Sequence, residues 1–500
     1  MNPAARRRLL WFLAVALVAV AAAVILLLPA PGQGIATGPP PLSYVGVSRC
    51  EECHADETAR WRASHHAVSL QEANERTVLG DFADARFDDG AQRARFYRGA
   101  GGFFVRTDGP GGRPGDYKVR YTIGVFPLQQ YLIEMPGGRY QAFGIAWDAR
   151  SRKQGGQRWL ALHPGERVGQ RSVLHWTKAT QNWNSECAEC HSTNVQKGYS
   201  WPQDEFATTF SAAAVSCEAC HGPGSRHVSW ALDARARGRP AIGDPGLVVR
   251  FGERRSRRWQ MDVVRGIARP TSAPELRVEV ETCARCHARS RLLTGEYWPG
   301  HLLAATHRPA LLEEGLYSAD GQIAGPVYEW GSFRESRMYA AGVTCADCHD
   351  AHDQKLKVGS DEVCSSCHQP EKFATRKHHF HREAGPGASC VACHMPGRTD
   401  MVVAERHDHS LRVPRPDLTL ALGPERAPNA CNGCHRNRTA RWAATAVRRW
   451  FPSGRSGQPH YGEALALGRG YGPAAERALV AVFRDPKLPG IAREIGRAHV

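Results

Sequence analysis

The pentapeptide Cys345-Ala346-Asp347-Cys348-His349 is one of eight C-x-x-C-H motifs in this chain of 500 residues. In chain order, motifs one to eight begin at Cys50, Cys187, Cys217, Cys283, Cys345, Cys364, Cys390 and Cys431. They contain all 16 cysteines of the chain. This is the attachment pattern of c-type haem, in which two thiols form thioethers to the vinyl groups and the next histidine binds the iron. The sequence therefore predicts eight covalently bound haems.

Two sets of residues follow from this pattern. The predicted attachment residues are Cys50, Cys53, Cys187, Cys190, Cys217, Cys220, Cys283, Cys286, Cys345, Cys348, Cys364, Cys367, Cys390, Cys393, Cys431 and Cys434. The predicted proximal iron ligands are His54, His191, His221, His287, His349, His368, His394 and His435. Zinc sites and redox dithiols also use paired cysteines. Neither requires a histidine directly after every pair, so haem attachment explains the set better.

The N-terminus predicts export. Arg6, Arg7 and Arg8 precede an apolar run from Leu9 to Leu28, which is long enough to span a bilayer with the arginines on the cytoplasmic side. Residues 1–31 are therefore expected to anchor the chain on the periplasmic side of the inner membrane. A cleaved signal peptide, which would leave the protein free in the periplasm, is the alternative. Residues 32–43 are rich in Pro and Gly and predict a linker.

The charge balance fits haem binding better than nucleic-acid binding. The formal net charge is +16. A ferric haem with two propionates contributes about −1 and a ferrous haem about −2, so that eight haems bring the total to about +8 or about 0. The basic residues are then expected to hold propionates. We expect no nucleic-acid partner, because the chain has no nucleic-acid-binding motif and is predicted to be exported from the cytoplasm.

Between motifs one and two the pattern predicts strands. Arg95–Arg98 and Phe103–Thr107 flank a glycine-rich turn, which indicates a hairpin. Alternating apolar residues follow in 116–123, 130–134 and 139–147. We expect a small antiparallel β-meander at about 84–150, serving as a lid or brace over the haem of motif one.

From residue 183 onward the motifs crowd together, with spacings that leave room for one helix or loop between haems. The predicted fold is therefore mostly α and irregular, a haem-stapled multihaem cytochrome domain over 44–437 with a small antiparallel β insertion. Residues 438–500 are expected to form a helical tail, with helices at Thr439–Phe451 and on either side of Asp485-Pro486. This tail is similar to the start of a helical-repeat array that has been truncated.

The second iron ligand decides whether a haem only carries electrons. A haem with histidine on both faces is saturated, whereas an open face can bind a small molecule. Fifteen of the 23 histidines lie outside the motifs, which is enough for eight distal ligands. Only six methionines are present, so histidine is expected to be the second ligand at most haems.

The chain resembles a bacterial family of multihaem cytochromes related to the tetrahaem carrier of ammonia oxidisers. The matching stretches are Tyr44-Val45-Gly46, Trp61, Ser64-His65-His66-Ala67, Gln181-Asn182-Trp183-Asn184-Ser185, Cys217–Gly224, Ser225-Arg226-His227, Gly342-Val343-Thr344, Cys393-His394-Met395-Pro396, Asp408-His409-Ser410, Pro414 and Pro428-Asn429-Ala430. The resemblance covers roughly residues 44 to 450. It implies an exported electron carrier but no particular substrate.

The family patterns also suggest distal ligands. They favour His66, with His65 as the alternative, and His227, His352 and His409. His175, His307 and His379 complete the set of candidates, and His378 or His381 are the alternatives to His379.

Three functions fit these observations. We expect electron transfer through bis-histidine haems between a quinol-linked membrane donor and a terminal acceptor. The alternative is an oxidoreductase that acts on a small nitrogen or sulfur compound at a five-coordinate haem, although all eight motifs are standard and none reads C-x-x-C-K. The third is a scaffold whose helical tail recruits partners.

Overall fold

The computed structural model describes residues 41–238, 245–251, 258–272, 278–294, 299–470 and 472–498. The chain divides into one unit from Met1 to Ser43 and another from Tyr44 to Val500, and the second is the one described below. The predicted anchor at 1–31 and most of the linker lie outside the described residues. Within the described ranges, no helix is both long enough and apolar enough to cross a membrane.

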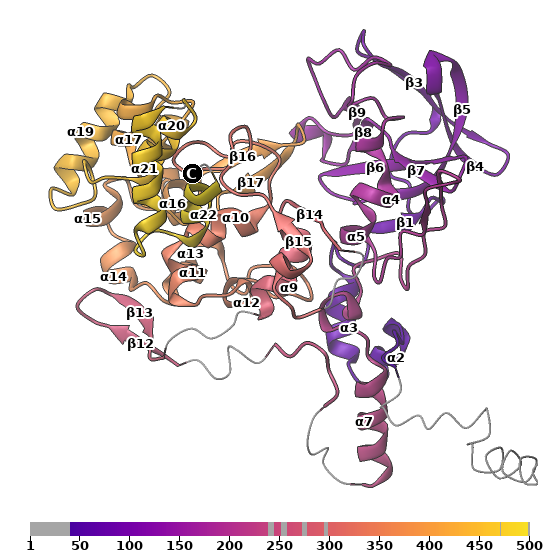
Figure 1. The fold of residues 1–500 in the computed structure, drawn as a ribbon, viewed down its shortest axis with the longest axis horizontal. Coiled ribbons are helices and arrows are strands. Elements are labelled where there is room, and N and C mark those ends of the chain that lie inside the picture. The colour runs from indigo at the N-terminus through magenta and orange to yellow at the C-terminus, as the bar shows by residue number, and fades with distance from the viewer. Residues whose placement is uncertain are drawn as a thin grey trace, which may run out of the picture. The chain divides into compact units, whose positions relative to one another are not determined.

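The β-structure is a nine-stranded antiparallel sheet, shown in indigo and purple in Figure 1. The order along the sheet is β2-β3-β4-β5-β6-β8-β9, with β1 paired to β5 and β7 to β6. The strands are β1 Leu70–Glu72, β2 Ala83–Asp88, β3 Arg93–Gly99, β4 Gly102–Asp108, β5 Pro114–Ile123, β6 Leu128–Met135, β7 Arg139–Ala142, β8 Ile145–Asp148 and β9 Arg158–Ala161. The expected fold, mostly α with a small β insertion, is therefore wrong: the protein is a mixed α/β structure with a large sheet.

The sheet is larger than the pattern predicted because its shortest strands are recruited by tertiary pairing. The hairpin is confirmed, with Gly99 opposite Gly102 and both Gly101 and Gly102 at positive φ. In contrast, β1 and β9 have three and four residues, too few to show alternation. They pair with β5 and β8.

An aromatic core stabilises this sheet. Phe82, Phe96, Tyr131 and Trp159 are buried in one cluster, and the rings of Phe96 and Trp159 stack with centroids 3.5 Å apart. Buried aromatic side chains of this size contribute on the order of 2–3 kcal/mol each. This cluster contains no motif cysteine, so the sheet has a core of its own.

The motifs lie on short helices. These are α2 Val47–Glu51, α5 Ala188–His191, α6 Cys217–His221, α9 Val278–His287, α12 Cys345–Cys348, α13 Ser360–Ser365, α16 Cys390–His394 and α18 Ala430–Cys434. The helices between them are α3 Ala55–Arg62, α4 Trp183–Glu186, α7 Ser225–Ala236, α10 Glu329–Glu335, α11 Arg337–Ala341, α14 Pro370–Phe373, α15 Arg376–His379 and α17 Pro416–Leu422.

Four small hairpins and five 3-10 turns complete the connections among the described residues. The hairpins are β10 Tyr199–Ser200 with β11 Glu205–Phe206, β12 Trp259–Asp262 with β13 Ile267–Pro270, β14 Ser290–Leu292 with β15 His307–Pro309, and β16 Gly397–Asp400 with β17 Ala404–His407. The 3-10 turns are η1 Pro110–Gly112, η2 Arg152–Gln154, η3 Ala179–Gln181, η4 Leu303–Ala305 and η5 Pro386–Ala388.

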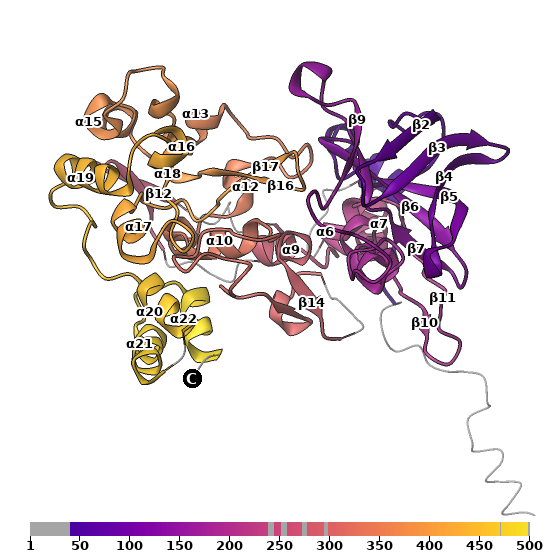
Figure 2. The same ribbon diagram turned by 90° about the horizontal axis from the view of Figure 1, so that it is seen from above.

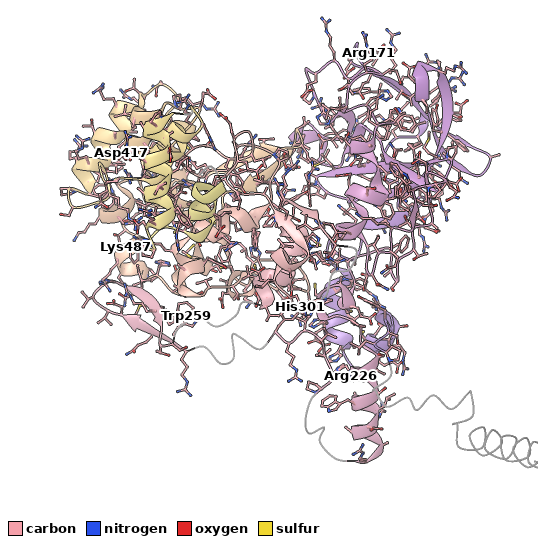
Figure 3. The ribbon with its side chains drawn as sticks, viewed as in Figure 1. Arg171, Arg226, Trp259, His301, Asp417 and Lys487 are labelled. Carbon is pink, nitrogen blue, oxygen red and sulfur yellow. The ribbon has the colours of Figure 1, made fainter. Side chains whose placement is uncertain are left out.

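The C-terminal segment consists of α19 Ala440–Trp450, α20 Tyr461–Gly468, α21 Pro473–Arg484 and α22 Gly490–Ala498. Helix α19 packs against α17, and the two views in Figures 1 and 2 place them side by side. Asp417 near the start of α17, which Figure 3 labels, pairs with Arg415 and accepts a hydrogen bond from Gly457 N. Helices α20–α22 share a buried cluster with Leu312, Tyr317 and Val327. The tail is thus packed onto the segment between motifs four and five.

Candidate haem sites

Each C-x-x-C-H motif occupies one helical turn. In motifs one, two, five, six and eight, the histidine N–H donates to the carbonyl of the first cysteine, at N–O distances of 2.8 to 3.2 Å. In motifs three, four and seven, one helix contains all five residues. Residues i, i+3 and i+4 of a helix lie on the same face. Both thiols and the imidazole of each motif therefore project to one side, as attachment to a single porphyrin requires.

Capping residues fix where two of these turns begin, and where the short helix before motif two begins. The side chain of Asn429 accepts from Asn432 N at 3.1 Å at the start of α18, and Asn182 accepts from Ser185 N at 3.0 Å at the start of α4. Thr344 N donates to Asp347 Oδ2 at 2.8 Å before α12. Such caps contribute about 1 kcal/mol each. The residues just before motifs two, five and eight are thereby explained by local structure.

Five motif histidines face a second histidine. The pairs are His54 with His227 (6.1 Å between ring centroids), His287 with His66 (6.4 Å), His349 with His409 (6.5 Å), His394 with His378 (6.1 Å) and His435 with His381 (6.1 Å). A metal bound by two imidazoles lies about 2 Å from each nitrogen, which separates the ring centroids by roughly 6 Å. These residues therefore fit a haem iron between the two rings.

The other three motif histidines differ. His221 interacts electrostatically with His352, without a direct ring contact. No histidine of the described residues makes a ring contact with His191, and His368 contacts the ring of Phe373 at 5.5 Å. Motifs two, three and six are thus the ones for which the described residues show no ring contact between the motif histidine and a second imidazole.

Three sequence-predicted distal ligands lie elsewhere. His307 Nε2 contacts Glu189 Oε1 at 3.0 Å and its Nδ1 contacts Thr306 Oγ1 at 2.8 Å. Both ring nitrogens of His175 also have protein partners, Thr177 and Gln170. His379 accepts a hydrogen bond from His381 N and has no motif histidine beside it among the described residues. Its neighbours His378 and His381 are the ones that face motifs seven and eight.

Burial favours the neutral form of two histidines near the motifs, His66 and His221. It lowers the pKa of His66 to about 4, with smaller contributions from His287 and His65. Burial likewise lowers the pKa of His221 to about 4, helped by the neighbouring His352. Iron binds the neutral form of imidazole, so these environments favour ligation at neutral pH.

Contacts between motifs define an order in space. Helix α2 packs against α6, α5 against α9, α9 against α12, α13 against α16, and α16 against α18. Cys220 interacts electrostatically with Cys286, and Cys348 with Cys367, which links motif three to four and motif five to six. The motifs therefore follow the line one, three, four, five, six, seven, eight. Motif two branches from motif four.

Comparison with known proteins supports a haem protein. A family model described as cytochrome c554 and c-prime matches residues 49–87 and 148–222, which contain motifs one to three. Together with the eight C-x-x-C-H motifs, this match makes the chain a multihaem c-type cytochrome. None of the curated proteins matches it.

The fold also has a solved counterpart. The structure titled "Crystal Structure of Outer Cell Wall Cytochrome OcwA" aligns with a TM-score of 0.50 over 91% of this chain and 96% of that chain, at 18% identity. At that identity the likeness concerns the fold alone.

Acidic residues that the sequence did not single out connect the motifs of this cytochrome. Glu218, the second residue of motif three, accepts hydrogen bonds from Val45 N at 2.8 Å, Gly46 N at 2.9 Å and Gly224 N at 2.9 Å. It thereby holds the segment before motif one against motif three. A buried carboxylate with three N–H donors is a strong restraint.

The same device recurs at two other motif contacts. Glu279 accepts from Ala346 N at 2.6 Å and joins motifs four and five. Asp361 accepts from Cys390 N at 3.1 Å and joins motifs six and seven. In the sequence, these acids are distinguished only by lying close to a motif. That position does not predict which other motif each acid contacts.

A carboxylate also contacts one proximal histidine. Glu329 Oε2 on α10 lies 3.1 Å from His287 Nδ1, and Arg406 holds the other carboxylate oxygen at 3.0 Å. Burial opposes ionisation of Glu329, but its hydrogen bond with His287 lowers its pKa to about 2. Burial alone would lower the pKa of His287, whereas the contact with Glu329 raises it. A carboxylate at Nδ1 makes the imidazole a stronger electron donor to iron.

Exposure singles out the two ends of the motif line. Cys53 in motif one and Cys434 in motif eight are exposed, and the other fourteen cysteines are partly buried. The motifs at which an attached haem edge would reach solvent most readily are therefore the first and the last.

Proposed function

We propose that this cytochrome carries eight covalent haems and conducts electrons along them outside the cytoplasm, between a membrane-linked donor and a terminal acceptor. The observation that carries the proposal is the continuous line of motif contacts, along which five motif histidines face a second imidazole at iron-binding spacing. A haem ligated on both faces has no site for a substrate, so its remaining role is electron transfer.

The haem, when bound, supplies one-electron chemistry at its iron. The protein's part is to hold neighbouring haems at fixed separations and to keep their axial ligands neutral. Glu218, Glu279 and Asp361 do the first by joining adjacent motifs. Burial of His66 and His221 does the second. None of these residues is required to move during transfer.

Two observations support the location and the donor. Three arginines precede the apolar run at 9–28, as in segments that direct export and anchor a chain in the inner membrane. Attachment of haem to C-x-x-C-H motifs takes place outside the bacterial cytoplasm. A quinol-linked membrane protein is then the natural donor, and haems with two histidines have the low potentials that such a chain requires.

Spin state tests the proposal. The ferric holoprotein, produced with the c-type maturation machinery, is examined by EPR and near-infrared magnetic circular dichroism. We expect low-spin bis-histidine signals from at least the five haems whose motif histidine faces another histidine. High-spin signals from most of the haems would overturn the assignment as an electron conductor.

A second function is favoured by motifs two, three and six. No histidine of the described residues makes a ring contact with His191, His221 or His368. An open haem face there would make the protein an oxidoreductase for a small nitrogen or sulfur compound. The same EPR and magnetic circular dichroism spectra distinguish this function from electron transfer alone. A high-spin signal that shifts on addition of nitrite, hydroxylamine or sulfite supports an oxidoreductase. Spectra with only low-spin signals, unchanged by all three compounds, exclude it.

A further inference from the structure

The end of the motif line at motif eight has an unusual surface charge. Six arginines and no acidic residue lie between Ala427 and Gly462. Five of them are exposed: Arg436, Arg438, Arg441, Arg448 and Arg449. None of these five forms an ion pair with another described residue. The acid on the helix packed against α19, Asp417, is already paired with Arg415 at 2.8 Å.

Aromatic side chains occupy the middle of this basic surface. Trp442 on α19 is 36% exposed, and its ring lies 4.9 Å from that of His435, the motif-eight histidine. Arg438 lies over the Trp442 ring at 5.7 Å. Nearby, the exposed Phe380 stacks on Trp450 with centroids 4.6 Å apart. An apolar centre with a charged rim is typical of the surface through which a protein binds a partner.

The opposite end of the line, at motif one, is different. There Arg49 pairs with Glu52 at 2.6 Å, and Arg60 pairs with Asp350 at 2.6 Å. Arg62 is paired with Glu51. The arginines near motif one are thus neutralised within the protein, whereas those near motif eight are not. The two exposed ends of the line present different charges to a partner.

Haem propionates do not remove this difference. One haem at motif eight brings two propionates, which would neutralise two of the five exposed arginines. Three uncompensated positive charges would then remain around Trp442. Unpaired charges of one sign around a site attract a partner of opposite charge and raise its rate of association.

We propose that the face of α19 around Trp442 is the docking surface for an acidic electron-transfer protein, which exchanges electrons with the haem of motif eight. This inference rests on the proposed function. The exchange moves one electron between the haem iron and the partner's cofactor, so that one is oxidised as the other is reduced and no bond is broken. Arg441 and Arg448, seven residues apart on one helix face, are expected to dominate the attraction.

Charged redox probes test the proposal on the reduced holoprotein. Stopped-flow oxidation is followed with the anion ferricyanide and the cation hexaammineruthenium(III), at low and at high salt. At low salt, the double variant Arg441→Glu/Arg448→Glu is expected to react with ferricyanide about tenfold more slowly than the wild type and faster with the cation. The difference should vanish at high salt because screening removes it.

The matched control reverses two exposed cationic residues, Arg113→Glu directly before β5 and Lys118→Glu on β5. It changes the net charge by the same amount but lies on a different element. The Soret spectrum and haem content establish that each variant is folded. Equal rates of oxidation in the control and the α19 variant would overturn the proposal, because the rates would then depend on the net charge of the protein and not on the position of the arginines.

Two further probes separate the kinds of partner. Flavodoxin serves as an acidic electron-transfer protein, and phosphatidylglycerol vesicles serve as an anionic membrane. Loss of reaction with flavodoxin in the α19 variant alone supports the proposal. Loss of vesicle binding with unchanged flavodoxin kinetics overturns it in favour of a membrane-binding face. If all haems of the α19 variant still reach redox equilibrium rapidly, only the docking surface fails and the proposed conduction stands.

Discussion

A histidine of this cytochrome can bind iron only if one of its two ring nitrogens is free of a protein partner. His409 directs Nδ1 to the carbonyl of His407 at 2.9 Å and faces His349, which leaves Nε2 for iron. His307 is equally close to a motif but uses both nitrogens, for Glu189 and Thr306. A histidine count shows that enough ligands exist, but only the position of both nitrogens selects them.

A pair of substitutions tests this distinction. His409→Ala is expected to convert one low-spin haem to high-spin, because it removes an iron ligand. His307→Ala should leave the number of low-spin haems unchanged. EPR of the ferric holoprotein measures both, and added imidazole should restore the low-spin signal in the first variant. The same spectrum for both variants would contradict the assignment.

Glu329 is expected to set the potential of the motif-four haem. Glu329→Gln weakens electron donation through His287 and should raise the potential of one haem. A difference of about 1 kcal/mol between oxidation states corresponds to roughly 40 mV for one electron. Spectropotentiometric titration measures the shift. Glu281→Gln, on the same segment as His287 but bonded to Leu303 N, is the control and should leave all potentials unchanged.

Among the elements, the helices that carry the motifs depend for their stability on contacts with other parts of the chain. Most have four to six residues, fewer than an isolated helix needs in water. Caps such as Asn429 and acids such as Glu218 supply part of the missing stability. Thioether bonds would supply the rest, which makes folding of this part dependent on haem attachment.

Glu218→Gln tests the acidic connections. The amide keeps one acceptor oxygen for three N–H groups, so that buried donors lose their partner at a cost of about 2 kcal/mol. We expect faster proteolysis of residues 44–66 in the holoprotein, followed by mass spectrometry. Glu52→Gln, which breaks only the exposed pair with Arg49, should have little effect. Equal cleavage rates in the two variants would show that Glu218 does not hold this segment.

At the level of the whole molecule, motif four is the junction. It contacts motifs two, three and five, and motif two packs against it through α5 and α9. Electrons that follow these contacts from motif one to motif eight cross motif four. Motif two lies off this line. Its haem, if open on one face, would receive electrons from motif four without interrupting transfer along the line.

Removal of single haems tests this branching. The variant Cys187→Ala/Cys190→Ala should lose one haem and keep rapid equilibration among the others. The variant Cys283→Ala/Cys286→Ala should lose one haem and slow equilibration between the two sides by orders of magnitude. Flash reduction followed by transient spectroscopy measures both rates. Similar rates would contradict a junction at motif four, and haem content excludes a general loss of folding.

Much of the site follows from the sequence, because its signals are local. The motif repeats give the attachment cysteines and proximal ligands, and one helical turn brings each set together. The hairpin at Gly99–Gly102 was equally predictable from its glycines. The size of the sheet was not, since β1 and β9 are too short to show a pattern and depend on partners far along the chain.

The sequence alone determined that this is a multihaem cytochrome, because haem attachment needs a covalent pattern of five consecutive residues. Only the tertiary structure decided which histidines face each other, how the motifs follow one another, and where unpaired arginines collect around motif eight. His66 follows motif one yet faces the histidine of motif four, and His227 follows motif three yet faces that of motif one. Such pairings depend on how distant segments pack, and no local spacing encodes them.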